Sequence, residues 1–156
     1  MRRSKQAGST MVETAFVLVP FFVLLLGIID VSLTVFLRST LQNAVNQGVK
    51  YAASAQVFPG KCHEESIRKV VQDNALGFLS GVRANTIAVN YYSSADLSKP
   101  IEGPTGSEPG NVVEVTVKDY DWNLLILNRF TSGSKFSAFA ADRLENGGDN
   151  STVLCR

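Results

Sequence analysis

The sequence has one histidine and two cysteines among its 156 residues. A single imidazole excludes sites that need several histidines, and two cysteines are too few for a disulfide-dense scaffold. The formal net charge is +1, so no global basic field is present and we expect no nucleic-acid partner. The sequence also lacks a G-x-S-x-G nucleophile elbow, a phosphate-binding glycine loop and an H-E-x-x-H pair. We therefore expect no enzymatic activity and no cofactor.

Hydrophobic residues are plentiful, at 45% of the chain. A chain of this length can bury the core of one domain, and hardly of two. Charge is distributed unevenly, because the first eight residues carry basic side chains and no acid, and the residues from 14 to 29 carry no charge. We therefore divide the chain into a basic leader, a transmembrane helix and a head, with the boundaries 1–8, 9–38 and 39–156.

The apolar segment 14–37 contains one acid, Asp30. As a helix it spans roughly 36 Å, enough to cross a hydrocarbon core of about 30 Å. Three interpretations stay open: a cleaved signal peptide, an uncleaved signal anchor, or a segment cleaved on its cytoplasmic side and kept as a membrane helix. A signal peptide fits poorly, because Glu13 separates the basic and apolar regions and no small-x-small site follows before Ala53-Ser54-Ala55. A buried core helix is disfavoured because so small a domain rarely buries so long a run.

The basic start predicts a cytoplasmic N-terminus, with the head on the periplasmic side of the inner membrane. Two acids need an explanation, because a carboxylate in hydrocarbon costs about 2.5–3.5 kcal/mol. Glu13 lies at the edge of the apolar run. Asp30 lies deeper, and it either marks the outer boundary of the span or pairs with a group on a neighbouring subunit.

The string Gly8-Ser9-Thr10-Met11-Val12-Glu13, followed by a long apolar helix, resembles type IV pilin-like precursors. Within that group, GSTMVETAFVLVPFFVLLLGIID resembles the TadE-like family of tight-adherence (Tad, Flp) pilus systems. The resemblance implies that a prepilin peptidase cleaves after Gly8, leaving Ser9 as the N-terminus and Glu13 as the fifth mature residue. The segments 47–53 and 136–145 are weaker matches. Thr14 departs from the family, which usually has an aromatic or apolar residue there.

The resemblance implies a minor pilin or pseudopilin that supports pilus assembly, adhesion or secretion. Its expected partners are the inner membrane, other pilins or pseudopilins, the prepilin peptidase and the pilus assembly platform. It would be a single-pass inner-membrane protein with a periplasmic head, or part of an extracellular pilus. The alternative is an uncleaved, membrane-anchored periplasmic binding or regulatory module.

The glycine and the glutamate also have a physical rationale. Glycine allows the backbone to lie extended in a protease groove, because no side chain intervenes. Cleavage creates an α-amino cation at Ser9, which the carboxylate of Glu13 can neutralise on the same or a neighbouring chain. A buried unpaired charge is costly, so this pairing favours one stagger between subunits.

The head is expected to be α+β and pilin-like, with a small antiparallel sheet. The first helix should continue to about residue 56, with an apolar stripe that packs on the head's own sheet, on another subunit, or on both. A second helix is predicted over 63–79, with Glu64 and Glu65 in its first turn. Alternation predicts strands over 87–92 and 113–118 and, more weakly, over 136–144, where a helix would also fit. The segment 93–110 is expected to be an exposed loop, and the apolar connection 121–127 to cover the sheet or face the membrane.

Cys62 and Cys155 are predicted to form a disulfide, because both fall on the extracytoplasmic side. Closure of so long a loop stabilises the fold by about 4–5 kcal/mol, less any strain. Cys62-His63-Glu64-Glu65 is not expected to bind a metal, because consecutive helical residues point in different directions. We expect His63 to lie on the surface at a helix start. Asp119 and Asp121 are expected to be solvated.

Overall fold

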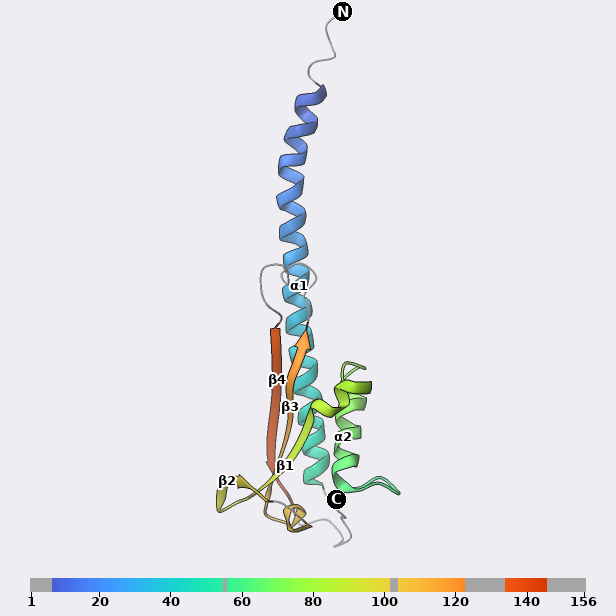
Figure 1. The fold of residues 1–156 in the computed structure, drawn as a ribbon, viewed down its shortest axis with the longest axis vertical. Coiled ribbons are helices and arrows are strands. Elements are labelled where there is room, and N and C mark those ends of the chain that lie inside the picture. The colour runs from blue at the N-terminus through green and yellow to red at the C-terminus, as the bar shows by residue number, and fades with distance from the viewer. Residues whose placement is uncertain (1–6, 55, 102–103, 123–133, 146–156) are drawn as a thin grey trace, which may run out of the picture. The chain divides into compact units, whose positions relative to one another are not determined.

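The computed structural model describes residues 7–54, 56–101, 104–122 and 134–145. They group into two units: residues 7–36 together with residue 134, and a second unit formed by the described parts of 37–122 and 135–145, which we call the head. The predicted α+β class is confirmed. In chain order the elements are α1 (Ala7–Ala53), α2 (His63–Asn74), the 3₁₀ helix η1 (Gly81–Thr86), β1 (Ile87–Ser93), β2 (Asp96–Pro100), the 3₁₀ helix η2 (Pro104–Ser107), β3 (Val112–Trp122) and β4 (Ser134–Arg143), as shown in Figure 1.

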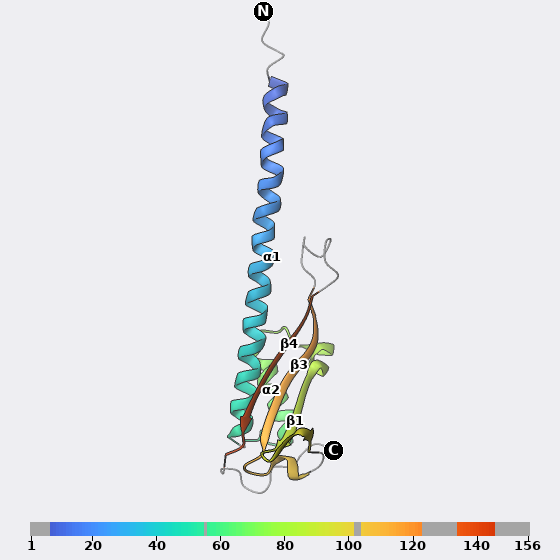
Figure 2. The same cartoon turned by 90° about the vertical axis from the view of Figure 1, so that its left-hand side faces the viewer.

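The head contains a four-stranded antiparallel sheet in the order β2-β1-β3-β4. Alternation along β1 and β3 puts one set of apolar residues on a common face, where all six are buried: Ile87, Val89 and Tyr91 of β1 and Val113, Val115 and Val117 of β3. The register pairs these residues directly across the two strands: Ile87 with Val117, Val89 with Val115 and Tyr91 with Val113. Within the head, α1 and α2 cover this face (Figure 2).

The predicted apolar stripe of the first helix packs against the head's own core. Five residues of that stripe are buried: Leu41, Ala44, Val45, Gly48 and Ala52. The sixth, Ala55, lies outside the described residues, and Leu37 and Val49 are buried beside the stripe. From α2, Ile67 and Val71 join the same core. The two helices approach closely at Gly48, because a Cβ added there would collide with Cγ2 of Val71. Packing within the head is therefore confirmed, and an additional contact with another subunit stays a prediction.

The second helix is shorter than predicted. It ends at Asn74 rather than at Leu79, because Leu76 and Gly77 adopt left-handed backbone angles, with φ of 50° and 82°. Such angles break the hydrogen-bond ladder of a right-handed helix. Ala75 and Leu79 are nevertheless fully buried, so the apolar spacing predicted their burial correctly and the helix end wrongly.

Two strand predictions need comment. The predicted loop 93–110 contains the short strand β2, which alternation could not reveal because all five of its residues are exposed. The segment 136–144 forms β4 rather than a helix. There the amide Nε2 of Gln42 on α1 donates a hydrogen bond to the carbonyl of Phe139, at 2.8 Å, which satisfies one backbone group on the edge strand.

An extra residue shifts the side-chain alternation near the end of β3. Val117 and Tyr120 are buried, whereas Lys118 and Asp119 between them are exposed. Asp119 has a φ of 50°, which fits an inserted residue of a β-bulge. Asp119 and Asp121 are both exposed, as predicted.

Candidate functional site

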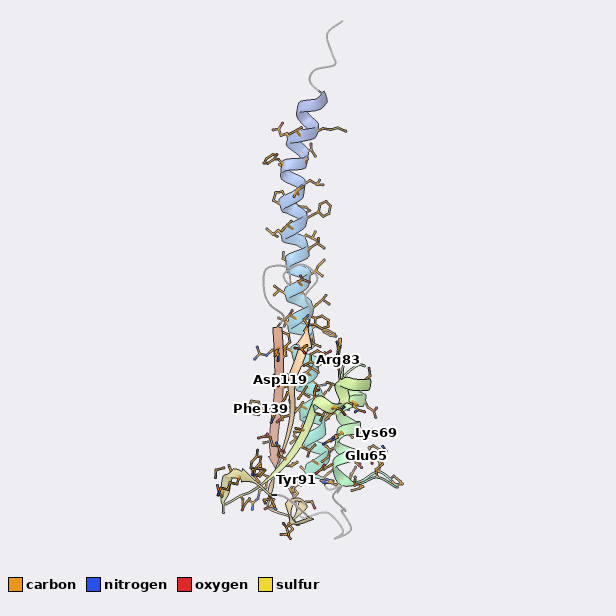
Figure 3. All side chains as sticks on the ribbon, viewed as in Figure 1. Glu65, Lys69, Arg83, Tyr91, Asp119 and Phe139 are labelled. Carbon is orange, nitrogen blue, oxygen red and sulfur yellow. The ribbon has the colours of Figure 1, made fainter. Side chains whose placement is uncertain are left out.

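The unit 7–36 displays apolar side chains all around the helix. Phe16 is 81% exposed and Met11 is 79% exposed, and exposed large hydrophobic residues continue on every face to Phe36. Figure 3 shows these side chains projecting from α1. Among the described residues, one helix is long and apolar enough to cross a membrane, Met11–Ala53. A helix that is hydrophobic on all sides requires an apolar environment, either lipid or other helices.

Polar groups within this segment are satisfied by the helix itself. The hydroxyl of Ser32 donates to the carbonyl of Ile28 at 2.8 Å, and that of Thr34 donates to the carbonyl of Asp30 at 2.9 Å. Such bonds to the carbonyl four residues earlier reduce the cost of placing a hydroxyl in lipid. α1 also continues through Pro20, and membrane helices tolerate an internal proline more readily than soluble ones.

Asp30 is the exception on this helix, because its side chain is only 2% exposed. Gly27 and Thr34 are partly covered, whereas the other described residues of 11–36 are exposed. Spacings of three and four residues place Gly27, Asp30 and Thr34 on one face of the helix. The carboxylate is therefore kept away from solvent. The two interpretations of Asp30, the outer boundary of the span or pairing with a group on a neighbouring subunit, both stay predictions.

The predicted cleavage site lies in the first turn of α1, which begins at Ala7. Glycine has the weakest helix propensity after proline, so Gly8 makes this turn easy to unwind into an extended protease substrate. Glu13 is exposed. It stands one helical turn after Ser9, so an amine created at Ser9 would lie within reach of a carboxylate on the same face.

The exposed apolar helix lies within a segment that matches a known protein family. The family model described as TadE-like protein matches residues 8–50. The chain carries a TadE-like N-terminal segment. The TadE-like match includes Gly8, Glu13 and Asp30 and continues into the part of α1 that packs in the head. TadE-like proteins are a pilin-like, structural class associated with Tad pili, and the match covers less than half of this chain. Comparisons with curated proteins and with solved structures gave no significant match.

His63 does not lie on the surface, so that prediction is wrong. Its side chain is 1% exposed, and its Nδ1 lies 2.9 Å from the hydroxyl oxygen of Tyr91. Burial lowers the pKa of the His63 imidazole, and the nearby backbone of Ala52 offsets this only in part. Burial, and then the charge of Glu64, raise the pKa of Tyr91. A lone histidine in a polar stretch gave no signal of burial, because its partner Tyr91 lies 28 residues away in the sequence.

We predict that acid destabilises the head through His63. The unfolded chain gains a proton near pH 6.5, whereas the folded imidazole resists protonation until a lower pH. The stabilisation is thus fully present above about pH 6.5 and is lost as the pH falls toward the lower folded value. Urea unfolding at a series of pH values should show this loss in the native chain and a shallower one in His63→Gln. An equal acid slope in both chains would contradict the assignment to His63.

The remaining predicted site residues are only partly described. Cys62 immediately precedes α2, and Cys155 lies outside the described residues, so the disulfide stays a prediction. Glu64 and Glu65 occupy the first turn of α2, as predicted. Within the described part of the chain, no group of three or more His, Cys, Asp and Glu residues is placed to hold a metal ion.

Proposed function

We propose that this chain is a minor pilin or pseudopilin of a Tad-type type IV pilus. In this proposal a prepilin peptidase removes residues 1–8, and the segment 9–38 holds the protein in the inner membrane with its head in the periplasm. The assembly platform then incorporates the subunit into a pilus, where its helix packs against those of other pilins or pseudopilins. The pilus serves adhesion or secretion. The observation that carries the proposal is the run of exposed large apolar side chains from Met11 to Phe36 within the TadE-like segment, with Glu13 five residues after Gly8.

The alternative is an uncleaved, membrane-anchored binding or regulatory module, which requires a ligand site in the head. A cleft of about 430 Å³ between α2 and η1 is lined mainly by polar and charged side chains. Its Lys61 is already paired with Glu65, at 2.6 Å. Ligand pockets are predominantly apolar with a few convergent polar groups, so this cleft does not favour the alternative.

Replacing Glu13 with glutamine distinguishes the pilin proposal from the anchored-module alternative. Removing the carboxylate leaves the Ser9 amine without its partner between packed helices, and a broken buried ion pair costs at least about 3 kcal/mol, or about 100-fold in assembly. We therefore expect Glu13→Gln to reduce the pilus yield about 100-fold, with unchanged amounts of the protein in the membrane. Pili sheared from cells and quantified by immunoblot provide the measurement.

Glu108→Gln is the matched control, because Glu108 is an exposed carboxylate of the head. It should assemble like the native chain. Normal pili from the Glu13→Gln variant would argue against the pairing and in favour of the anchored module.

A further inference from the structure

One exposed leucine is held in a strained backbone conformation. Leu76, in the turn after α2, is 69% exposed and has a φ of 50°. Glycine or asparagine would adopt this left-handed angle at lower cost. The exposed side chain of Leu76 adds little to the packing of the head, although its backbone angle is unfavourable. Backbone outliers of this kind point to a functional constraint.

Several contacts bring the turn after α2, η1, the end of β3 and the start of β4 to one end of the head. The rings of Phe78 and Trp122 meet edge to face, with centroids 6.3 Å apart. Arg83 donates a hydrogen bond to the hydroxyl of Tyr120 at 2.9 Å. Lys135 lies 3.8 Å from Asp119. Figure 3 shows Arg83 and Asp119 at this end and Tyr91 and Glu65 nearer the other end.

This end of the head is also where α1 enters it. Two contacts fix how β4 runs along the helix: Gln42 bonds to Phe139 at 2.8 Å, and the N–H of Glu145 bonds to the carbonyl of Ala53 at 3.3 Å. The strand and the helix therefore run in the same direction. Lys135 lies four strand residues, about 13 Å, before Phe139, and Leu37 lies five helix residues, about 7.5 Å, before Gln42, so Lys135 reaches at least the level at which the head part of α1 begins. Leu37 follows directly after the exposed apolar unit, which ends at Phe36.

The composition of this end matches a membrane interface. Trp122 is partly buried and belongs to a residue type that is enriched at headgroup level. Exposed cations outnumber exposed acids there by one: Arg38, Arg83, Lys118 and Lys135 against Asp73, Asp119 and Asp121. Lys135 and Asp119 are both well exposed, so Lys135 stays part of a surface with a positive excess, which attracts anionic lipid headgroups.

We propose that this end of the head, which we call the membrane-facing end, rests on the anionic phospholipid surface of the bilayer that α1 spans. Leu76 inserts its side chain among the lipids, Trp122 lies at headgroup level, and Arg38, Arg83 and Lys135 face lipid phosphates. The inference rests on the proposed membrane placement of residues 9–38. It gives the head a fixed resting position on the membrane before the subunit is drawn into a pilus.

Trp122 is the only tryptophan of the chain, so its fluorescence reports on the membrane-facing end alone. The full chain would be reconstituted in phosphatidylcholine vesicles containing phosphatidylglycerol, with lipids brominated near the headgroup as quenchers. We expect strong quenching in the native chain. The variant Leu76→Asn removes the apolar side chain but tolerates the left-handed angle, and it should weaken docking about tenfold. Leu97→Asn, at a leucine that is 62% exposed on β2, should change nothing.

A charge variant tests the electrostatic part. Lys135→Gln should weaken docking about fivefold, and added salt should weaken docking of the native chain. Lys99→Gln on β2 is the control.

Flotation with the vesicles separates this inference from the pilin proposal. If the chains float but Trp122 is not quenched, or its quenching is unchanged by Leu76→Asn, the inference is overturned and the pilin proposal stands. Chains that do not float with the vesicles would overturn both. Protection of Trp122 from acrylamide in pili, but not in vesicles, would assign this end to a neighbouring subunit and overturn the inference.

Discussion

Replacing Gly48 with leucine is expected to lower the free energy of unfolding of the head by about 3 kcal/mol. The close approach of α1 and α2 leaves no space at this position, because even a Cβ would collide with Cγ2 of Val71. Valine is stiff at χ1 in a helix, so it cannot rotate away freely. The helices would have to separate, and the buried residues of both stripes would lose contacts. Urea unfolding of the full chain, followed by Trp122 fluorescence, measures the effect.

Two variants serve as controls for this prediction. Gly48→Ala should cost less, because the higher helix propensity of alanine, worth about 1 kcal/mol, offsets part of the collision. Gly27→Leu lies on the same helix, but a Cβ there meets nothing within 4 Å, so the stability of the head should not change. Equal stability of Gly48→Leu and the native chain would show that the two helices do not pack as described.

Reduction of the predicted disulfide should lower the stability of the head by about 4 kcal/mol. A bond between Cys62 and Cys155 would tie the start of α2 to the end of the chain and so close a loop through nearly the whole head. In the chain-entropy account, this closure restricts the unfolded state far more than the folded one. Urea unfolding with and without a reductant measures the difference.

The double variant Cys62→Ser, Cys155→Ser is the control for that experiment. It should unfold at the urea concentration of the reduced native chain and should not respond to the reductant. A native chain whose unfolding midpoint is the same in both conditions would contradict the bond.

Composition and periodicity predicted the elements whose burial leaves a regular pattern in the local sequence. The apolar segment was recognisable because an uncharged run of that length can span a bilayer and is too long for the core of so small a domain. The strands β1 and β3 were predictable because one side of each is buried, which imposes alternation of apolar and polar residues. For the same reason the stripe on α1 identified the helix face that contacts the core.

The remaining features depend on contacts that a local pattern does not record. The strand β2 has no buried side chain, so nothing in its sequence distinguishes it from a loop. The early end of α2 depends on the backbone angle of Leu76, a residue that favours helices. The burial of His63 depends on Tyr91, which lies in a different element, and the shift of Tyr120 into the core depends on the bulge at Asp119. In the candidate site, the exposure of the helix was predictable, whereas the burial of Asp30 was not.

The intact mass of the membrane-extracted protein, from cells with and without the cognate prepilin peptidase, tests the central claim most directly. The pilin proposal predicts a peptidase-dependent loss of Met1–Gly8 that leaves Ser9 at the N-terminus. The same samples, measured before and after reduction, would show the gain of two protons that a Cys62–Cys155 bond predicts. A full-length chain in both kinds of cell would contradict the pilin pathway and favour the uncleaved anchored module.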